Sequence, residues 1–102
     1  MDNDSLKGLL RSAISNLESV RNYTENDFIS HKSYNVINML LQILDSKPFN
    51  PNKEQIQTIH NIVDTIHTES DKEFDIVGER AFDSLQDLDF ALQMLTTKAK
   101  EN

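Results

Sequence analysis

The chain has 102 residues, of which 17 are acidic and 10 basic, and a formal net charge of −7. This length is typical of one domain, so we expect residues 1–102 to form a single domain with its own core. The absence of cysteine excludes a disulfide framework and a thiolate metal site. Only two glycines and two prolines are present, whereas a β-sandwich or barrel needs a turn every ~8–12 residues. The composition therefore predicts an all-α protein.

The chain carries no segment typical of a secreted or membrane protein. Its first four residues, Met1-Asp2-Asn3-Asp4, are acidic where a secretory signal is basic and then apolar. The longest apolar stretch, residues 36–44, is interrupted by Asn38 and Gln42 and is too short to span a bilayer. We therefore expect a soluble, cytoplasmic protein that does not associate with membranes.

Residues 5–22 are predicted to form the first helix, because their apolar residues recur at helical spacing. Ser5 or Asp4 is expected to cap its N-terminus. The apolar face comprises Leu6, Leu9, Leu10, Ala13, Ile14, Leu17 and Val20.

Residues 25–46 are predicted to form the second helix, preceded by a weak capping box of Thr24 and Asp27. The polar stretch 30–33 interrupts the apolar pattern and leaves open whether this segment is one helix or two. The aromatic residues near the first joint are expected to close the end of the core. They are Tyr23, Phe28 and Tyr34.

Residues 47–51, Lys-Pro-Phe-Asn-Pro, form the clearest break in the helical pattern. Pro48 cannot continue a helix, and Asn50 before Pro51 has the form of a cap residue followed by proline at the first helical position. A third helix is therefore predicted over residues 51–67.

Residues 71–98 are predicted to form the fourth helix, since Ser70 and Glu73 have the spacing of a capping box. Four helices with short joints predict an antiparallel four-helix bundle with up-down-up-down topology. The apolar stripe of this helix is expected to centre near Leu85 and Leu92 and to comprise Phe74, Val77, Ala81, Leu85, Leu88, Leu92 and Leu95.

Most of the charge lies on or near the fourth helix. Residues 64–89 contain nine acidic and two basic residues, and thus the whole net charge of −7. Nucleic acid is not expected to bind this surface directly, because phosphate binding needs clustered lysine and arginine. Acidic residues recur at every fourth position of the helix: Asp71, Asp75, Glu79, Asp83 and Asp87.

Apolar residues lie among these acids on what we call the outer face of the fourth helix. Phe90 points about 170° away from the predicted stripe centre on a helical wheel of about 100° per residue. We predict the outer face as the partner-binding site, with the residues Ile76, Glu79, Asp83, Asp87, Phe90 and Met94. Three interpretations remain open: another part of the chain covers this face, a second copy pairs with it, or another protein binds there.

The sequence does not predict an enzyme, a metal site or a cofactor. His60, Asp64 and His67 share one side of the third helix, but histidines at the edge of a core stripe are better explained by packing. The serines and acids show no arrangement of nucleophile, base and orienting group.

In its length, predicted helical bundle and concentrated acidic face, the chain resembles small inhibitory partner proteins. Examples are immunity proteins of bacterial toxins, anti-defence proteins of phages and secretion chaperones. We therefore expect a non-enzymatic, acidic inhibitor, immunity-type or escort protein that binds a basic partner protein through the outer face. The alternative is a homodimeric structural or regulatory protein that uses the same face, so both monomer and homodimer remain open. A DNA-associated regulator ranks third, because the first helix has few basic residues: Lys7, Arg11 and Arg21.

Overall fold

The computed structural model describes residues 3–70 and 75–101, with side chains for 3–70 and 76–97. The described residues form four α-helices: α1 (Asn3–Tyr23), α2 (Asp27–Asp45), α3 (Lys53–Ser70) and α4 (Asp75–Glu101). The prediction of an all-α four-helix bundle is confirmed.

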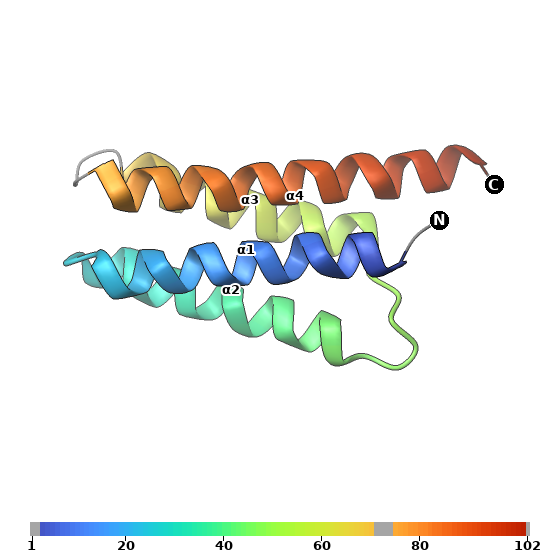
Figure 1. Ribbon diagram of the computed structural model, residues 1–102, viewed down its shortest axis with the longest axis horizontal. Coiled ribbons are helices and arrows are strands. Elements are labelled where there is room, and N and C mark those ends of the chain that lie inside the picture. The colour runs from blue at the N-terminus through green and yellow to red at the C-terminus, as the bar shows by residue number, and fades with distance from the viewer. Residues whose placement is uncertain (1–2, 71–74, 102) are drawn as a thin grey trace.

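The helices are arranged so that each packs against its neighbours in the chain and α4 closes the bundle against α1. The contacting pairs are α1–α2, α2–α3, α3–α4 and α1–α4, the last being the most extensive. Figure 1 shows the elongated bundle, with the start of α1 and the end of α4 at the same end. The bundle measures 44 × 23 × 19 Å along its principal axes.

The core is almost entirely aliphatic, and all four helices contribute to it. The largest fully buried side chains include Leu6, Leu10, Leu17, Ile29, Leu40, Ile56, Ile66 and Leu88. Between α1 and α4 the buried residues are smaller, with Ala13 facing Ser84. The hydroxyl of Ser84 lies 3.2 Å from the carbonyl oxygens of both Ala13 and Arg80, so it donates its proton to one or the other. Small side chains thus allow α1 and α4 to approach closely.

The start of α2 differs from the prediction, because Asn26 and not Thr24 is its cap. The Asn26 side chain accepts hydrogen bonds from the amides of Phe28 (2.8 Å) and Ile29 (3.2 Å). Thr24 Oγ1 instead accepts from the amide of Asn26 at 3.1 Å. Asparagine is the stronger N-cap residue of the two. From Asp27 onward α2 is one continuous helix, so the 30–33 stretch does not divide it.

The start of α3 also differs from the predicted Asn50-Pro51 cap. The amide of Asn52 donates to Gln55 Oε1 (3.0 Å), and the amide of Gln55 donates to Asn52 Oδ1 (2.8 Å). This reciprocal pair is a capping box, and the helix begins at Lys53. Pro51 is buried ahead of the helix instead of forming its first turn.

The boundary between α3 and α4 is described only on the α3 side. Ser70 is the buried last residue of α3, and its hydroxyl donates to the carbonyl of His67 at 2.8 Å. It therefore satisfies a carbonyl group in the last turn of α3. Three residues predicted for the start of the fourth helix lie outside the described residues: Asp71, Glu73 and Phe74. At the other end of the chain, α1 begins at Asn3, so Asp4 and Ser5 lie inside its first turn instead of preceding it.

The aromatic residues near the α1–α2 joint are exposed, so the expectation that they close the core is wrong. Tyr23, Phe28 and Tyr34 all lie at the surface. The Arg21 guanidinium lies 4.9 Å from the centre of the Tyr34 ring, and Lys32 Nζ lies 5.7 Å from that of Phe28. These rings pack against cations, while short aliphatic residues such as Val20 and Ile29 fill the interior nearby.

Candidate protein-binding surface

The buried side of α4 is not centred where the apolar pattern places it. The residues buried against the bundle are Val77, Ala81, Ser84, Leu88, Ala91 and Leu95. Leu85 and Leu92, the predicted centre, are only partly buried. On the helical wheel, the mean direction of these buried residues differs by about 40° from that of the predicted stripe. This rotation brings Phe90 and Met94 closer to α1 than the sequence indicates.

The predicted outer-face residues differ widely in exposure. Phe90 is 53 % exposed and Ile76 is 38 % exposed, and Glu79 is exposed as well. Met94 is partly buried and packs against the core. Asp83 and Asp87 are half-buried. The described part of the chain therefore does not cover Phe90 and Ile76, and the first of the three interpretations is wrong for these two residues.

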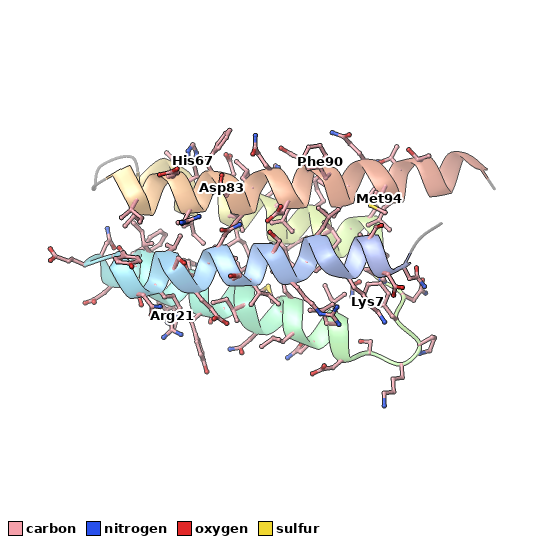
Figure 2. All side chains as sticks on the ribbon, in the orientation of Figure 1. Lys7, Arg21, His67, Asp83, Phe90 and Met94 are labelled. Carbon is pink, nitrogen blue, oxygen red and sulfur yellow. The ribbon has the colours of Figure 1, made fainter. Side chains whose placement is uncertain are left out.

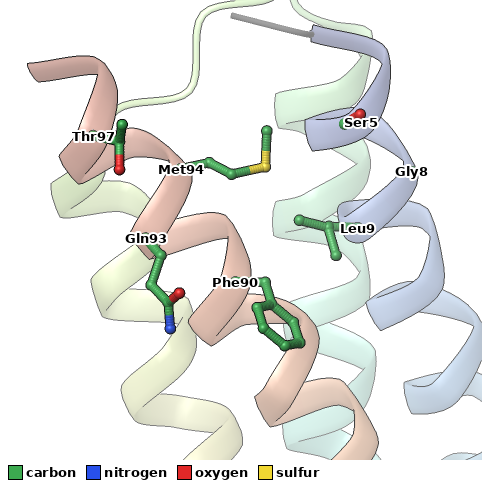
Figure 3. Close-up of a pocket in the computed structure, with 7 residues that line it drawn as sticks. All are labelled: Ser5, Gly8, Leu9, Phe90, Gln93, Met94 and Thr97. Carbon is green, nitrogen blue, oxygen red and sulfur yellow. The ribbon is translucent and has the colours of Figure 1, made fainter. Parts of the chain in front are cut away.

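Phe90 and Met94 border an open groove of about 710 Å³ between α1 and α4, which we call the α1–α4 groove. In Figure 3, Met94 extends from α4 towards α1 and Leu9 extends from α1 towards α4. None of the described residues that line it carries a charge. These residues are Ser5, Gly8 and Leu9 of α1 and Phe90, Gln93, Met94 and Thr97 of α4.

The contribution of α1 to this groove was not predicted. Leu9 is at the edge of the apolar face of α1 and was assigned to the core, against which it does pack while partly buried. Gly8 and Ser5 carry no signal of their own in the sequence. Only the packing of α1 on α4 brings them opposite Phe90.

Gly8 is a helix-interior glycine that the fold itself does not require. No glycine in the described part of the chain has a positive φ, and a Cβ built on Gly8 meets no atom within 4 Å. A glycine inside a helix costs roughly 0.5–1 kcal/mol relative to alanine. The space above the α1 backbone at this point is therefore open.

The acidic residues at every fourth position of α4 become less exposed along the helix from Glu79 to Asp87. Glu79 is exposed, whereas Asp83 lies 3.7 Å from Arg80 Nη1 on the same helix. Asp87 accepts a hydrogen bond from Asn16 Nδ2 at 3.2 Å. Burial raises the pKa of Asp87 above its usual 3.8, partly offset by hydrogen bonds from Ser12 and Asn16. Figure 2 shows Asp83, Phe90 and Met94 in succession along α4.

The other side of α4 contacts α3 through two histidines. His60 Nε2 lies 2.7 Å from Asp89 Oδ1, and the ring of His67 packs on Phe82 with 5.7 Å between ring centres. Neither Asp89 nor Phe82 was a predicted contact. The side chains that the structure describes contain no group of three or more histidines and acids that could hold a metal ion.

Comparison with known proteins does not add a functional assignment. No family model matches the chain, and no curated protein or solved structure matches it either. Within residues 3–70 and 75–101, no helix is long and apolar enough to cross a membrane.

Proposed function

We propose that this four-helix protein is a non-enzymatic binding module, an acidic inhibitor, immunity-type or escort protein whose partner is a basic protein. The binding surface in this proposal is the outer face of α4, extended by the α1–α4 groove. One observation carries it: Phe90 is more than half exposed at the edge of a groove whose described lining residues are uncharged. A helix face that only meets solvent has no need of a phenylalanine there.

The surroundings of Phe90 supply the two parts that a protein-binding site uses. Met94 and Leu9 add apolar surface beside it, and Ile76 adds an exposed apolar side chain about 21 Å away along α4. Large apolar side chains at the centre of an interface contribute most of its binding energy. Glu79 and Asp83 add negative charge along the same helix. Charges at the rim of an interface accelerate the encounter with a partner of opposite sign.

A comparison of matched baits tests the proposal. The wild type, Phe90→Asp and Phe82→Asp would each be immobilised and exposed to a lysate of the source cells. Phe82 is a suitable control because it is also exposed on α4 but contacts His67 of α3. We expect proteins of high isoelectric point to be retained by the wild type and Phe82→Asp and to be lost from Phe90→Asp.

The rate of association of a purified captured partner gives the second half of the test. The association rate constant should fall severalfold between about 0.05 and 0.5 M salt, since the Debye length shrinks from roughly 14 to 4 Å over that range. Equal retention by all three baits, or an association rate indifferent to salt, would contradict the proposal.

A homodimeric structural or regulatory protein is the second candidate. It is favoured by the absence of charge among the described residues that line the α1–α4 groove, because Phe90 of one copy could enter the groove of another without bringing the acids of α4 together. Light scattering on a sizing column at low and high salt separates the two. A mass of 11.7 kDa at both salts supports the binding module. A mass of twice that value, reduced by Phe90→Asp, supports the dimer.

A further inference from the structure

We infer that the α1–α4 groove receives an amphipathic α-helix of the partner whose apolar anchors and basic residues occupy separate halves. The apolar half lies over Leu9, Phe90 and Met94, and the basic half lies beside Glu79 and Asp83. This inference rests on the proposed function and specifies the chemistry of the partner.

The shape of the groove fits a helix and not an extended strand. Its walls are two antiparallel helices, α1 and α4, whose backbone amides and carbonyls are already bonded within each helix. An extended peptide would find no sheet edge there and would leave its own backbone groups unpaired over an apolar surface. A helical segment satisfies its backbone internally and presents side chains alone.

The length of the groove matches two turns of such a helix. Phe90 and Thr97 mark its limits along α4, and seven residues correspond to about 10 Å at 1.5 Å per residue. Anchors at positions i, i+3 or i+4, and i+7 span that distance. The grooves between α1 and α2 and between α2 and α3 have about half the volume, 330 and 370 Å³.

Gly8 marks the place where the partner helix approaches most closely. The fold does not need a glycine there, since a Cβ would meet nothing within 4 Å. A helix that crosses α1 at Gly8 can come closer to its backbone than at any position with a side chain. A glycine at this position of α1 makes the helix less stable than an alanine would. Close approach of the partner helix gives a reason for the glycine that the unbound fold does not.

The charges determine how the partner helix is divided. The described residues that line the groove are uncharged, while Glu79 and Asp83 precede Phe90 by seven to eleven residues on α4. At 1.5 Å per residue that offset is about 10–16 Å along the axis. The basic residues of the partner are therefore displaced from its apolar anchors by about ten positions, and we place them at its C-terminal end because that order suits the helix dipole.

A designed peptide tests the inference directly. It is an acetylated and amidated 18-residue helix with leucines at i, i+3 and i+7 in its first half and four lysines in its second half. The first control has the same composition with lysines interleaved among the leucines. The second control carries two central prolines that prevent helix formation. Binding is measured by titration of ¹⁵N-labelled protein at low salt.

We expect saturable binding of the designed peptide, with the largest shifts at Gly8, Leu9 and Phe90, and at least tenfold weaker binding of both controls. Gly8→Leu fills the groove and should weaken binding at least tenfold. The control is Ser15→Leu, which adds the same side chain to α1 in the groove facing α2 and should change nothing. Circular dichroism verifies that both variants remain helical.

The outcomes separate this inference from the proposed function. If the paired change Glu79→Gln and Asp83→Asn weakens binding but Gly8→Leu does not, the acidic face binds the peptide and the groove inference is wrong. If the interleaved peptide binds as tightly as the designed one, the division into two halves is wrong. If the designed peptide does not bind while a basic partner is still lost from Phe90→Asp, the binding module stands and the helical partner does not.

Discussion

Asn16 of α1 donates a hydrogen bond to Asp87 of α4 at 3.2 Å, across 71 positions of the chain. The contact joins the two helices that pack most extensively. Asp87 was predicted as one of a row of partner-binding acids, but its half-buried carboxylate already has partners in α1. Asp87 therefore contributes to the contact between α1 and α4, and both it and the exposed Glu79 remain predicted contacts for another protein.

The burial of Asp87 predicts how stability depends on pH. Its pKa is raised above 3.8 mainly by desolvation, so the folded state binds the proton more tightly than the unfolded state does. The contribution of this group to the free energy of unfolding is therefore complete below pH 3.8 and decreases as the pH rises through the raised pKa.

The substitution Asp87→Asn removes this pH dependence and keeps an oxygen that accepts from Asn16. Relative to wild type, its free energy of unfolding should increase between pH 3 and pH 7, by a small amount because the carboxylate is partly exposed to solvent. Urea unfolding of both proteins at the two pH values measures the difference. A relative loss at pH 7 would mean that the hydrogen bonds to the carboxylate outweigh its desolvation.

Two buried serines are expected to respond in opposite ways to replacement by alanine. Ser33 Oγ is buried and has no hydrogen-bond partner among the described residues, so Ser33→Ala should stabilise the protein by about 1 kcal/mol. Ser84 Oγ bonds to a backbone carbonyl at the α1–α4 contact, so Ser84→Ala should cost about 0.5–1.5 kcal/mol. Thermal unfolding should show Tm shifts of opposite sign, about 4–8 °C per kcal/mol. Shifts of the same sign would refute the contrast.

The fold was predictable because the information for it is local. Apolar residues recur at helical spacing in four segments, and Pro48 and Pro51 mark the longest joint between them. The centre of the buried side of α4 was not predictable from hydrophobicity. Ser84 and Ala91 are less hydrophobic than Leu85 and Leu92, yet they are the more deeply buried. Their small size, and not their polarity, places them against α1, where Ala13 leaves room.

The candidate site was predictable only in part, because half of it is formed by the packing of α1 on α4. Phe90 and Ile76 stand out because they interrupt a polar face of one helix, and both are exposed. Gly8 and Leu9 become part of the site only through packing between residues more than 80 positions apart. Sequence spacing within one helix carries no information about such a contact.

The corrected cap of α3 gives a prediction with an internal control. Asn52 accepts from the amide of Gln55 and donates its own amide to the Gln55 side chain, so Asn52→Ala should lower the free energy of unfolding by about 1 kcal/mol. Asn50 is exposed two residues earlier, and Asn50→Ala should change it by less than about 0.5 kcal/mol. Urea unfolding of the two variants measures both values. The reverse order would restore Asn50 as the cap.

The exposure of Phe90 predicts a small effect on folding, which distinguishes a binding residue from a core residue. Phe90 is 53 % exposed, whereas its neighbour Leu88 is fully buried. Phe90→Ala should therefore lower the free energy of unfolding by less than about 1 kcal/mol, because half of the ring already meets water. Leu88→Ala leaves a cavity and should cost about 2–5 kcal/mol.

Both variants can be measured by urea unfolding at pH 7, where the slope of the transition also reports whether the folded state stays compact. A loss for Phe90→Ala as large as that for Leu88→Ala would make Phe90 a structural residue and remove the main support for the binding surface. If Phe90→Ala lowers the free energy of unfolding only slightly and no longer retains the captured partner, Phe90 is assigned to binding. The bundle would then stay folded while partner binding is lost.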